Sequence, residues 1–275
     1  MNDPAPVIMN ILGINMRCLS YAEMYPIYDR WLSDKAARSH SLAVINTYIS
    51  VCALFDKRLR DMYNSADLVG IDSMPFLKWA RTFYKKASDR FYAPDLMLQV
   101  SGQVKEKGYT FFLYGGYPEE PAGIEEYLNQ RFEGLRIVGK YSPPFRPLTE
   151  EEELAVCKLI NDVQPDFLWV GLGSPKQDVW IRTHLEKIHG CIMMPSGATF
   201  DFFGGRIRQA PKWIRDTGFE WLFRLTQDSK RLWTRYTIYN FLFVLAFSLQ
   251  LVRIMTFDGE GFLRIFGRRT QFGNS

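Results

Sequence analysis

Apolar runs of strand length alternate along this chain with segments of helical spacing, and that alternation restricts the fold more than any other feature. Continuous apolar strands are buried on both faces, as in a parallel sheet. The runs are Ser41–Asn46, Ala66–Asp72, Tyr109–Gly116, Leu135–Tyr141, Pro165–Gly173 and Gly190–Ala198. The helical segments between them are Thr47–Tyr63, Met74–Lys86, Glu119–Phe132, Thr149–Asp162 and Pro175–Ile188. We therefore predict an α/β fold, with an open, mostly parallel sheet and helices on both faces.

The pattern changes after Pro211. No further strand-like run is recognised there, and we expect the chain to be helical almost to its end. The predicted domains are accordingly an α/β domain over residues 1–210 and a helical appendage over residues 211–275.

Basic residues precede an uncharged, aromatic-rich stretch in this C-terminal part. The stretch Tyr236–Val252 has 17 residues, short of the roughly 20 that cross a bilayer. We expect residues 224–257 to lie in a membrane interface, with the cations at lipid headgroups. The alternatives are a helix packed on the protein's own core or on a second subunit, and a membrane span. The basic residues are Arg224, Lys230, Arg231 and Arg235.

Composition excludes several classes of protein. The chain has 275 residues and 34 Lys and Arg against 30 Asp and Glu, so its net charge of +4 gives no reason to expect a nucleic-acid partner. The four cysteines form no CxxC pair and are expected to be reduced, buried thiols, as in a cytosolic protein. The first residues lack the basic and then apolar order of a signal peptide, so secretion is not expected. The cysteines are Cys18, Cys52, Cys157 and Cys191.

Polar residues follow two of the early apolar runs. Ligands of open α/β sheets bind at the carboxyl ends of the strands, which makes Asn46, Thr47 and Asp72 candidate site residues. An ionisable Asp at the end of a buried strand is costly unless it is paired, caps a helix or is catalytic. Spacing alone favours a helix N-cap for Asp72 over a catalytic role, because Pro75 would fall in the first turn of the next helix.

Glycines follow two of the later runs. Gly115 and Gly116 allow close approach of a ligand to the backbone, or form a plain turn. VGLGSPKQD, residues 170–178, places Gly171 and Gly173 before a helix whose free N–H groups can hold a phosphate, with Lys176 adding charge. An ordinary tight turn explains the same residues. Neither GxxxxGK[ST] nor a complete GxGxxG is present, so a Walker loop and a dinucleotide site are not predicted.

Asp201 lies among aromatic residues in a second glycine-rich stretch, residues 196–205. It is either a hydrogen-bond acceptor for a sugar or ribose, or an N-cap or loop brace. The three histidines are scattered without metal-ligand spacing, and no DxD or GxSxG motif occurs. No metal site is predicted.

Four motifs follow one another in the second half of the chain: VGLGSPKQDVWI, SGATFDFFGG, RQAPKWI and GFEWLFRL, with RLWTRY after them. NSADLVGIDSMP and ASDRFYAPDLM precede them. Together these motifs resemble the WecG/TagA/CpsF family of bacterial glycosyltransferases (glycosyltransferase family 26), of the exopolysaccharide type. The resemblance covers roughly residues 10 to 240, and several ordered motifs are far more specific than any single one.

The resemblance implies a Rossmann-like α/β fold with a C-terminal appendage that completes the site at the membrane. It implies inverting transfer of a sugar from a UDP-sugar to a sugar on a polyprenyl diphosphate, at the cytoplasmic face of the inner membrane, in exopolysaccharide synthesis. The donor sugar would be N-acetylmannosamine, its uronic acid, glucose or glucuronate. The acceptor sugar, the linkage and the oligomeric state are left open, including a homo-oligomer.

The resemblance also suggests roles for individual residues. Asp72 matches the family's catalytic aspartate and would deprotonate the acceptor hydroxyl. Without a DxD motif no metal or other cofactor is expected, so cationic side chains would stabilise the leaving UDP. These cations are Arg224, Arg231 and Arg235. The predicted substrate-binding residues are Asn46, Thr47, Asp95, Gly115, Gly116, Gly171, Gly173, Pro175, Lys176, Gln177 and Asp201.

The sequence departs from the family pattern at several positions, and these departures bear on the donor more than on the reaction. They are Val44 for a Thr, Ser73 for the Gly after the aspartate, Ala93–Leu96 for GxDL, Asp178 for Glu, and Gln209 for the Arg of RAP. The rival functions are another enzyme acting on nucleotide sugars, such as an epimerase or a dehydrogenase, and a non-enzymatic membrane scaffold of a polysaccharide complex.

Overall fold

The computed structural model describes residues 7–36, 38–86, 88–257, 263–265 and 268–269. The chain forms two compact units, each assembled from separate stretches of sequence. Unit 1 comprises residues 1–20, 44–90 and 209–275, and unit 2 comprises residues 21–43 and 91–208. The C-terminal segment therefore belongs to the same unit as the first strand-end motif.

The predicted α/β sheet is confirmed. Hydrogen-bonded neighbours follow the order β4-β3-β8-β7-β5-β6, and the pairs β3–β8, β8–β7, β7–β5 and β5–β6 are all parallel. The strands carry the apolar runs expected from the sequence. Their bounds are β3 His40–Ile45, β4 Leu68–Ile71, β5 Thr110–Gly115, β6 Arg136–Tyr141, β7 Phe167–Gly171 and β8 Ile192–Pro195.

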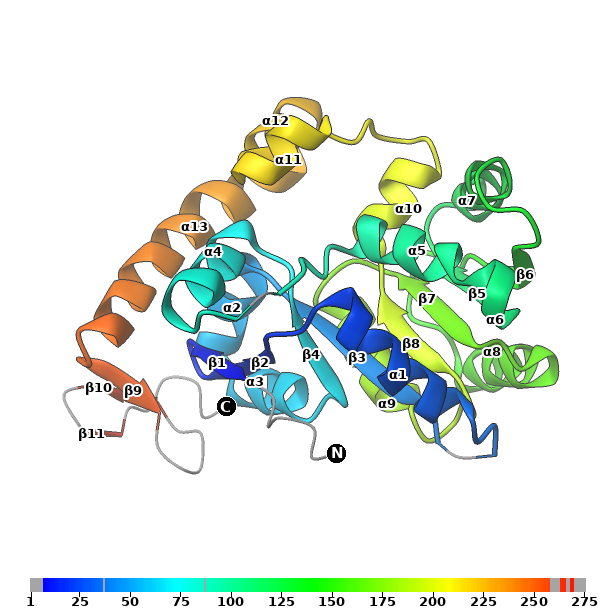
Figure 1. The fold of residues 1–275 in the computed structure, drawn as a ribbon, viewed down its shortest axis with the longest axis horizontal. Helices are drawn as coiled ribbons and strands as arrows, with labels where there is room; N and C mark the ends of the chain where they lie inside the picture. The colour runs from blue at the N-terminus through cyan, green and yellow to red at the C-terminus, as the bar shows by residue number, and fades with distance from the viewer. Residues whose placement is uncertain (1–6, 37, 87, 258–262, 266–267, 270–275) are drawn as a thin grey trace. The chain divides into compact units, whose positions relative to one another are not determined.

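Helices cover both faces of the unit 2 strands because alternate strand residues point to opposite sides (Figure 1). Phe112, Leu168 and Met193 pack against α8 (Glu150–Val163) and α9 (Lys176–His184) on one face. On the other face Phe167 meets Tyr28 of α1, with ring centroids 5.6 Å apart. The helices of this unit are α1 Tyr21–Leu32, α5 Ala93–Gly102, α6 Val104–Lys107, α7 Glu120–Asn129, α8 Glu150–Val163, α9 Lys176–His184 and α10 Gly197–Phe203.

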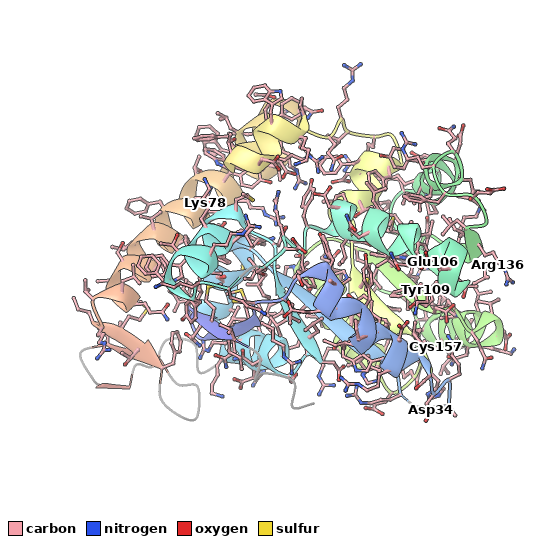
Figure 2. The ribbon with its side chains drawn as sticks, in the orientation of Figure 1. Asp34, Lys78, Glu106, Tyr109, Arg136 and Cys157 are labelled. Carbon is pink, nitrogen blue, oxygen red and sulfur yellow. The ribbon has the colours of Figure 1, made fainter. Side chains whose placement is uncertain are left out.

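Three of the four cysteines lie in the protein interior, as predicted. Cys157 on α8, labelled in Figure 2, is buried in the unit 2 core, where burial raises the pKa of its thiol. Cys18 and Cys191 are buried as well, whereas Cys52 on α2 (Thr47–Phe55) is half-buried. All four are free thiols.

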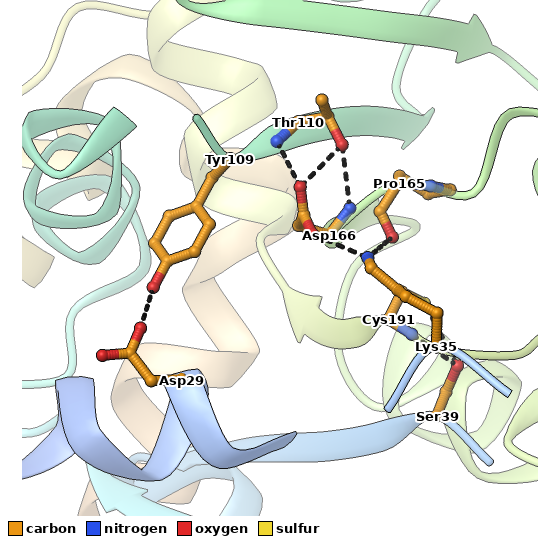
Figure 3. A network of polar contacts seen from close by, with 8 residues as sticks. All are labelled: Asp29, Lys35, Ser39, Tyr109, Thr110, Pro165, Asp166 and Cys191. Atoms are coloured by element: carbon orange, nitrogen blue, oxygen red, sulfur yellow. Dashed lines mark hydrogen bonds and ion pairs between the residues drawn. The ribbon is translucent and has the colours of Figure 1, made fainter. Parts of the chain in front are cut away.

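A polar network closes the amino ends of β5 and β7 in unit 2 (Figure 3). The carboxylate of Asp166 accepts hydrogen bonds from the backbone N of Thr110 at 2.7 Å, from the Thr110 hydroxyl at 2.8 Å and from Lys35 Nζ at 2.6 Å. The Tyr109 hydroxyl donates to Asp29 at 2.5 Å. These residues satisfy one another, so this edge of the unit 2 strands has a structural role.

Unit 1 combines a hairpin, the strand β4 and the helices of both of its longer segments. The hairpin pairs β1 Ile8–Ile11 with β2 Ile14–Arg17, and a small antiparallel sheet joins β9 Met255–Phe257, β10 Leu263–Ile265 and β11 Arg268–Arg269. The helices are α2 Thr47–Phe55, α3 Lys57–Asn64, α4 Met74–Phe83, α11 Lys212–Thr217, α12 Glu220–Gln227 and α13 Ser229–Leu251.

Helix α13 buries one face within unit 1. Phe243 packs on Phe76, with ring centroids 5.2 Å apart, and Asn240 accepts a hydrogen bond from the Thr47 hydroxyl at 3.1 Å. The opposite face leaves large apolar side chains exposed at helical spacing. These are Trp233, Ile238, Phe241, Val244, Leu245 and Leu251, with Val252 just beyond the helix end. Among the described residues, no helix is both long enough and apolar enough to cross a membrane.

Three sequence expectations are wrong in detail. The helix expected over Thr47–Tyr63 is interrupted at Asp56, whose extended backbone and N-capping carboxylate begin α3. The run Gly190–Ala198 is a strand only to Pro195, and α10 starts at Gly197. Strands also occur after residue 211, where none was expected, since β9 follows α13.

Candidate active site

The Asp72 carboxylate lies immediately after β4 in unit 1, and its surroundings differ from those of a helix cap. Ser73 occupies the N-cap position of α4, so the N-cap interpretation of Asp72 is wrong. The Asp72 side chain is 16% exposed, and its Oδ2 accepts a hydrogen bond from Asn46 Nδ2 at 3.2 Å. Asn46 is itself held by its own role as N-cap of α2, where its Oδ1 accepts from the backbone N of Ile49 at 3.0 Å.

Arg90 is a cationic residue that contacts Asp72 directly. Its Nε donates to the backbone oxygen of Asp72 at 2.5 Å, and its Nη2 lies 3.8 Å from Asp72 Oδ1. The pKa of Asp72 is raised, chiefly because burial disfavours the charged form, while Arg90 and the Asn46 hydrogen bond oppose the shift. Such a carboxylate is a stronger proton acceptor than one in water.

Two of the three predicted arginines lie in the same part of unit 1. The guanidinium of Arg235 on α13 stacks 4.3 Å from the ring centre of Tyr48, and its charge acts on Asp72. Burial lowers the pKa of Arg235, and the like charge of Arg224 on α12 adds to the effect. The side chain of Arg231 lies outside what the structure describes. Two positive charges that raise each other's free energy in this way favour binding of an anion.

Thr47 is placed beside this cluster but is engaged in holding unit 1 together. Its hydroxyl donates to Asn240 of α13, and its backbone N donates to the Ser73 hydroxyl at 3.1 Å. These two bonds connect the start of α2 to α13 and to the turn after β4. We call this group of neighbouring side chains in unit 1 the Asp72 cluster, and its members are Asn46, Thr47, Asp72, Arg224 and Arg235.

The predicted glycines lie in unit 2, in the turns after β5 and β7, and the structural reason for a glycine differs from one position to the next. A Cβ on Gly115 would lie 2.6 Å from the Gly171 backbone, and a Cβ on Gly171 would lie 2.3 Å from the Phe200 ring. Gly116 has a φ of +72° and donates its N–H to the Gly171 oxygen at 3.0 Å. Gly173 has a φ of +78° and open space where a Cβ would stand. Gly173 is therefore the glycine that a ligand can approach.

Gln177 connects two turns of unit 2. Its Oε1 accepts from the backbone N of Gly173 at 3.0 Å and from that of Gly197 at 3.1 Å, and its Nε2 donates to the Ser174 hydroxyl at 3.0 Å. Pro175 is the N-cap residue of α9, and Lys176, exposed, is its first residue. The arrangement rigidifies the backbone around the free space at Gly173.

Asp201 on α10 forms an ion pair with Arg206, which also pairs with the buried Glu120 at 3.0 Å. Glu120 accepts from the backbone N of Tyr117 at 2.9 Å, so this pair of carboxylates braces the turn after β5. Asp95 lies in the first turn of α5. The carboxylate of Asp201 is thus shared with an arginine, which fits the brace interpretation and leaves its contact with a donor a prediction.

Several polar groups that the structure places in these two regions carry no recognisable signal in the sequence. Arg90 and Glu220 lie within the motifs ASDRFYAPDLM and GFEWLFRL, but neither follows a predicted strand or has a spacing that marks it as a site residue. The hydroxyls of Ser196 and Thr199, at the turn after β8, are buried and have no hydrogen-bond partner within the described chain. Only the burial and pairing in the fold identify these groups. No group of three or more His, Cys, Asp or Glu suited to a metal ion occurs among the described residues.

The match to known proteins agrees with the motifs. A model of the glycosyl transferase WecG/TagA/CpsF family matches residues 9–256, which is most of the chain. The match includes the Asp72 cluster of unit 1 and the glycine turns of unit 2. The chain therefore belongs to the WecG/TagA/CpsF family of glycosyltransferases.

Proposed function

We propose that this glycosyltransferase moves a sugar, with inversion, from a UDP-sugar to a sugar carried on a polyprenyl diphosphate. Asp72 is the base that removes the proton from the acceptor hydroxyl as the hydroxyl oxygen attacks the anomeric carbon. The observation that carries the proposal is the Asp72 carboxylate, partly exposed at a strand end, with its pKa raised by burial and no capping role.

The leaving UDP develops negative charge, which must be stabilised as the glycosidic bond to it breaks. Arg224 and Arg235 are the proposed source of positive charge. Burial disfavours the charged form of Arg235 and lowers its pKa, and a bound anion would offset that free-energy cost. Arg231 is assigned the same role from its place in the motif alone. We expect the reaction to need no metal ion.

The donor nucleotide is assigned to the glycine turns of unit 2. Gly173 offers open space beside its backbone, and α9 begins three residues later with the exposed Lys176. The helix N-terminus and the lysine both favour a phosphate group. The buried hydroxyls of Ser196 and Thr199 have no hydrogen-bond partner among the described residues and flank Gly197, whose N–H bonds to Gln177, so they are candidates for further bonds to the donor.

The exposed apolar face of α13 supports a peripheral membrane position. Its side chains recur at helical spacing, from Trp233 through Phe241 to Val252, on a helix whose other face is packed in unit 1. Such a helix can bury its outer face among lipid headgroups and the first methylenes of the chains. We propose that this face binds the cytoplasmic surface of the inner membrane, where the polyprenyl acceptor would be found.

A panel of UDP-sugars with a synthetic prenyl-diphosphate sugar tests the reaction, with products identified by mass spectrometry. N-acetylmannosamine, its uronic acid, glucose and glucuronate are the donor sugars to include. Asp72→Asn should leave UDP binding intact, measured by calorimetry, and abolish product. Product formation by Asp72→Asn at the native rate would overturn the base assignment, and no product with any UDP-sugar would overturn the choice of donor class.

Flotation with anionic vesicles tests the membrane position. Trp233→Ser and Phe241→Ser together should reduce vesicle binding without lowering UDP affinity, because both side chains are exposed on α13. Tyr84→Ser, at an exposed aromatic beyond the end of α4, is the matched control. Unchanged flotation of the double variant would show that α13 does not face lipid.

A further inference from the structure

Glu220 is a buried carboxylate in the motif GFEWLFRL, and no step of the proposed reaction uses it. It is the first residue of α12 and is 6% exposed. Its Oε2 accepts a hydrogen bond from Arg90 Nη2 at 3.2 Å, within unit 1. A buried carboxylate needs such a partner, since burial without one costs several kcal/mol.

The contacts of Arg90 show what this pairing does. Its Nε is fixed on the backbone oxygen of Asp72 at 2.5 Å, and its Nη2 is directed to Glu220. The same Nη2 stands 3.8 Å from Asp72 Oδ1, which is beyond hydrogen-bonding distance. Asp72 Oδ1 has no hydrogen-bond donor among the described residues. Glu220 thus receives the charge-assisted bond that Arg90 would otherwise give to Asp72.

The other charges around Asp72 do not duplicate the effect of Glu220. Arg235 of α13 and Arg90 both act to stabilise the Asp72 carboxylate, and Asn46 from the start of α2 adds a hydrogen bond. Arg224 of α12 is positive, and the first turn of α4 carries no charged residue. Glu220 is a negative group that acts on Asp72, and it opposes these cations.

We propose that Glu220 is a positioning residue that keeps Asp72 a strong base by holding and neutralising Arg90. The inference rests on the proposed role of Asp72. In the transfer, the acceptor O–H proton moves to Asp72, the acceptor oxygen bonds to the anomeric carbon, and UDP leaves with the electron pair of its glycosidic bond. Without Glu220, Arg90 closes on Asp72 Oδ1, the carboxylate is stabilised and its tendency to take the proton falls.

Titration of the Asp72 carboxyl by carbon NMR of the aspartate-labelled full chain tests this directly, with Asp72→Asn assigning the signal. Glu220→Gln keeps a hydrogen-bond acceptor and removes the charge, so the pKa of Asp72 should fall by about one unit. The acid limb of the kcat profile should move to lower pH by the same amount, while the kcat plateau falls and KM for the donor stays constant.

Two variants separate charge from packing. Glu220→Asp restores the charge with a shorter side chain and should return the pKa of Asp72 toward the native value. Glu152→Gln removes a carboxylate that pairs with Arg146 in unit 2, and should leave the titration and the rate profile unchanged. Thermal unfolding of each variant verifies that the chain is folded at the temperature of the assay.

The outcomes distinguish failure of the inference from failure of the proposed function. An unchanged pKa of Asp72 in folded Glu220→Gln overturns the inference and leaves Asp72 as the base. A fallen pKa with an unmoved acid limb shows that Asp72 does not set the rate as a base, which overturns the proposed mechanism and the inference with it. Equal shifts of the two, restored by Glu220→Asp, support both.

Discussion

Removal of the Gln177 side chain measures how far the two turns of unit 2 depend on one amide. In Gln177→Ala the N–H groups of Gly173 and Gly197 lose their acceptor, and the Ser174 hydroxyl loses a donor. Each bond contributes about 1 kcal/mol net, so the variant should lose about 3 kcal/mol of unfolding free energy. At roughly 2–4 °C for each kcal/mol, the melting temperature should fall by roughly 6–12 °C.

Gln177→Glu separates the structural role from ligand binding. The carboxylate still accepts from both backbone N–H groups, and only the bond to Ser174 is lost, so stability should fall by about 1 kcal/mol. The added negative charge beside the proposed phosphate position should weaken UDP binding by more than the stability change explains, because like charges repel in a partly buried site.

Urea unfolding followed by tryptophan fluorescence, with UDP titration by calorimetry, provides both readings. Gln130→Ala, at an exposed glutamine that ends α7, is the control and should change stability by less than about 0.5 kcal/mol. Native stability in Gln177→Ala would refute the bracing role of the amide. Native UDP affinity in Gln177→Glu would refute the placement of the diphosphate at these turns.

Asp72→Asn should increase the unfolding free energy at pH 7. A carboxyl whose pKa is raised on folding stabilises the folded state at pH values below its usual pKa, and this contribution is lost as the pH rises through the raised pKa. Urea unfolding at pH 4 and pH 7 measures the effect, and an equal difference between variant and native protein at both pH values would contradict it. Turnover should survive EDTA, and strict dependence on manganese in the product assay would show that a metal stabilises the leaving group. Gly115→Ala should lower the unfolding free energy by more than about 2 kcal/mol, because the new Cβ would lie 2.6 Å from the Gly171 backbone. Gly134→Ala is the control for the backbone effect alone, about 1 kcal/mol, because Gly134 has a φ of +82° and no neighbour within 4 Å of an added Cβ. Equal losses in thermal unfolding of the two variants would refute the packing argument.

Five of the six strands were predictable because they are apolar enough to be buried on both sides of a sheet, whereas β6, at the end of the strand order, is exposed or half-buried along its whole length. Their order was not, since β8 lies between β3 and β7 although it comes last of the six in the chain. The hairpin of β1 and β2 escaped prediction because each strand has only four residues with an alternating pattern. The break at Asp56 escaped it because apolar spacing continues across that residue, and only the extended backbone and the cap reveal it.

The candidate site was likewise predictable in part from the sequence. The sequence indicates Asp72, the glycine turns and the late arginines through motifs, and the roles of these residues stay predictions. It favoured an N-cap role for Asp72 on spacing alone, because spacing does not show which residue faces the free N–H groups of α4. In the structure the N-cap position of α4 falls on Ser73, without a side-chain cap bond, and the Asp72 carboxylate is paired with Asn46 and Arg90 instead.

The sequence alone determined the alternation of strands and helices, the places of the glycine-rich turns and the family of the chain, since each depends on residue types close together along the backbone. Only the tertiary structure decided the electrostatics of Asp72. Arg90 and Glu220 are 130 residues apart in the chain, yet their side chains meet at 3.2 Å. The basicity of a carboxylate depends on burial and on charges a few ångströms away, and folding brings those charges together from distant parts of the sequence.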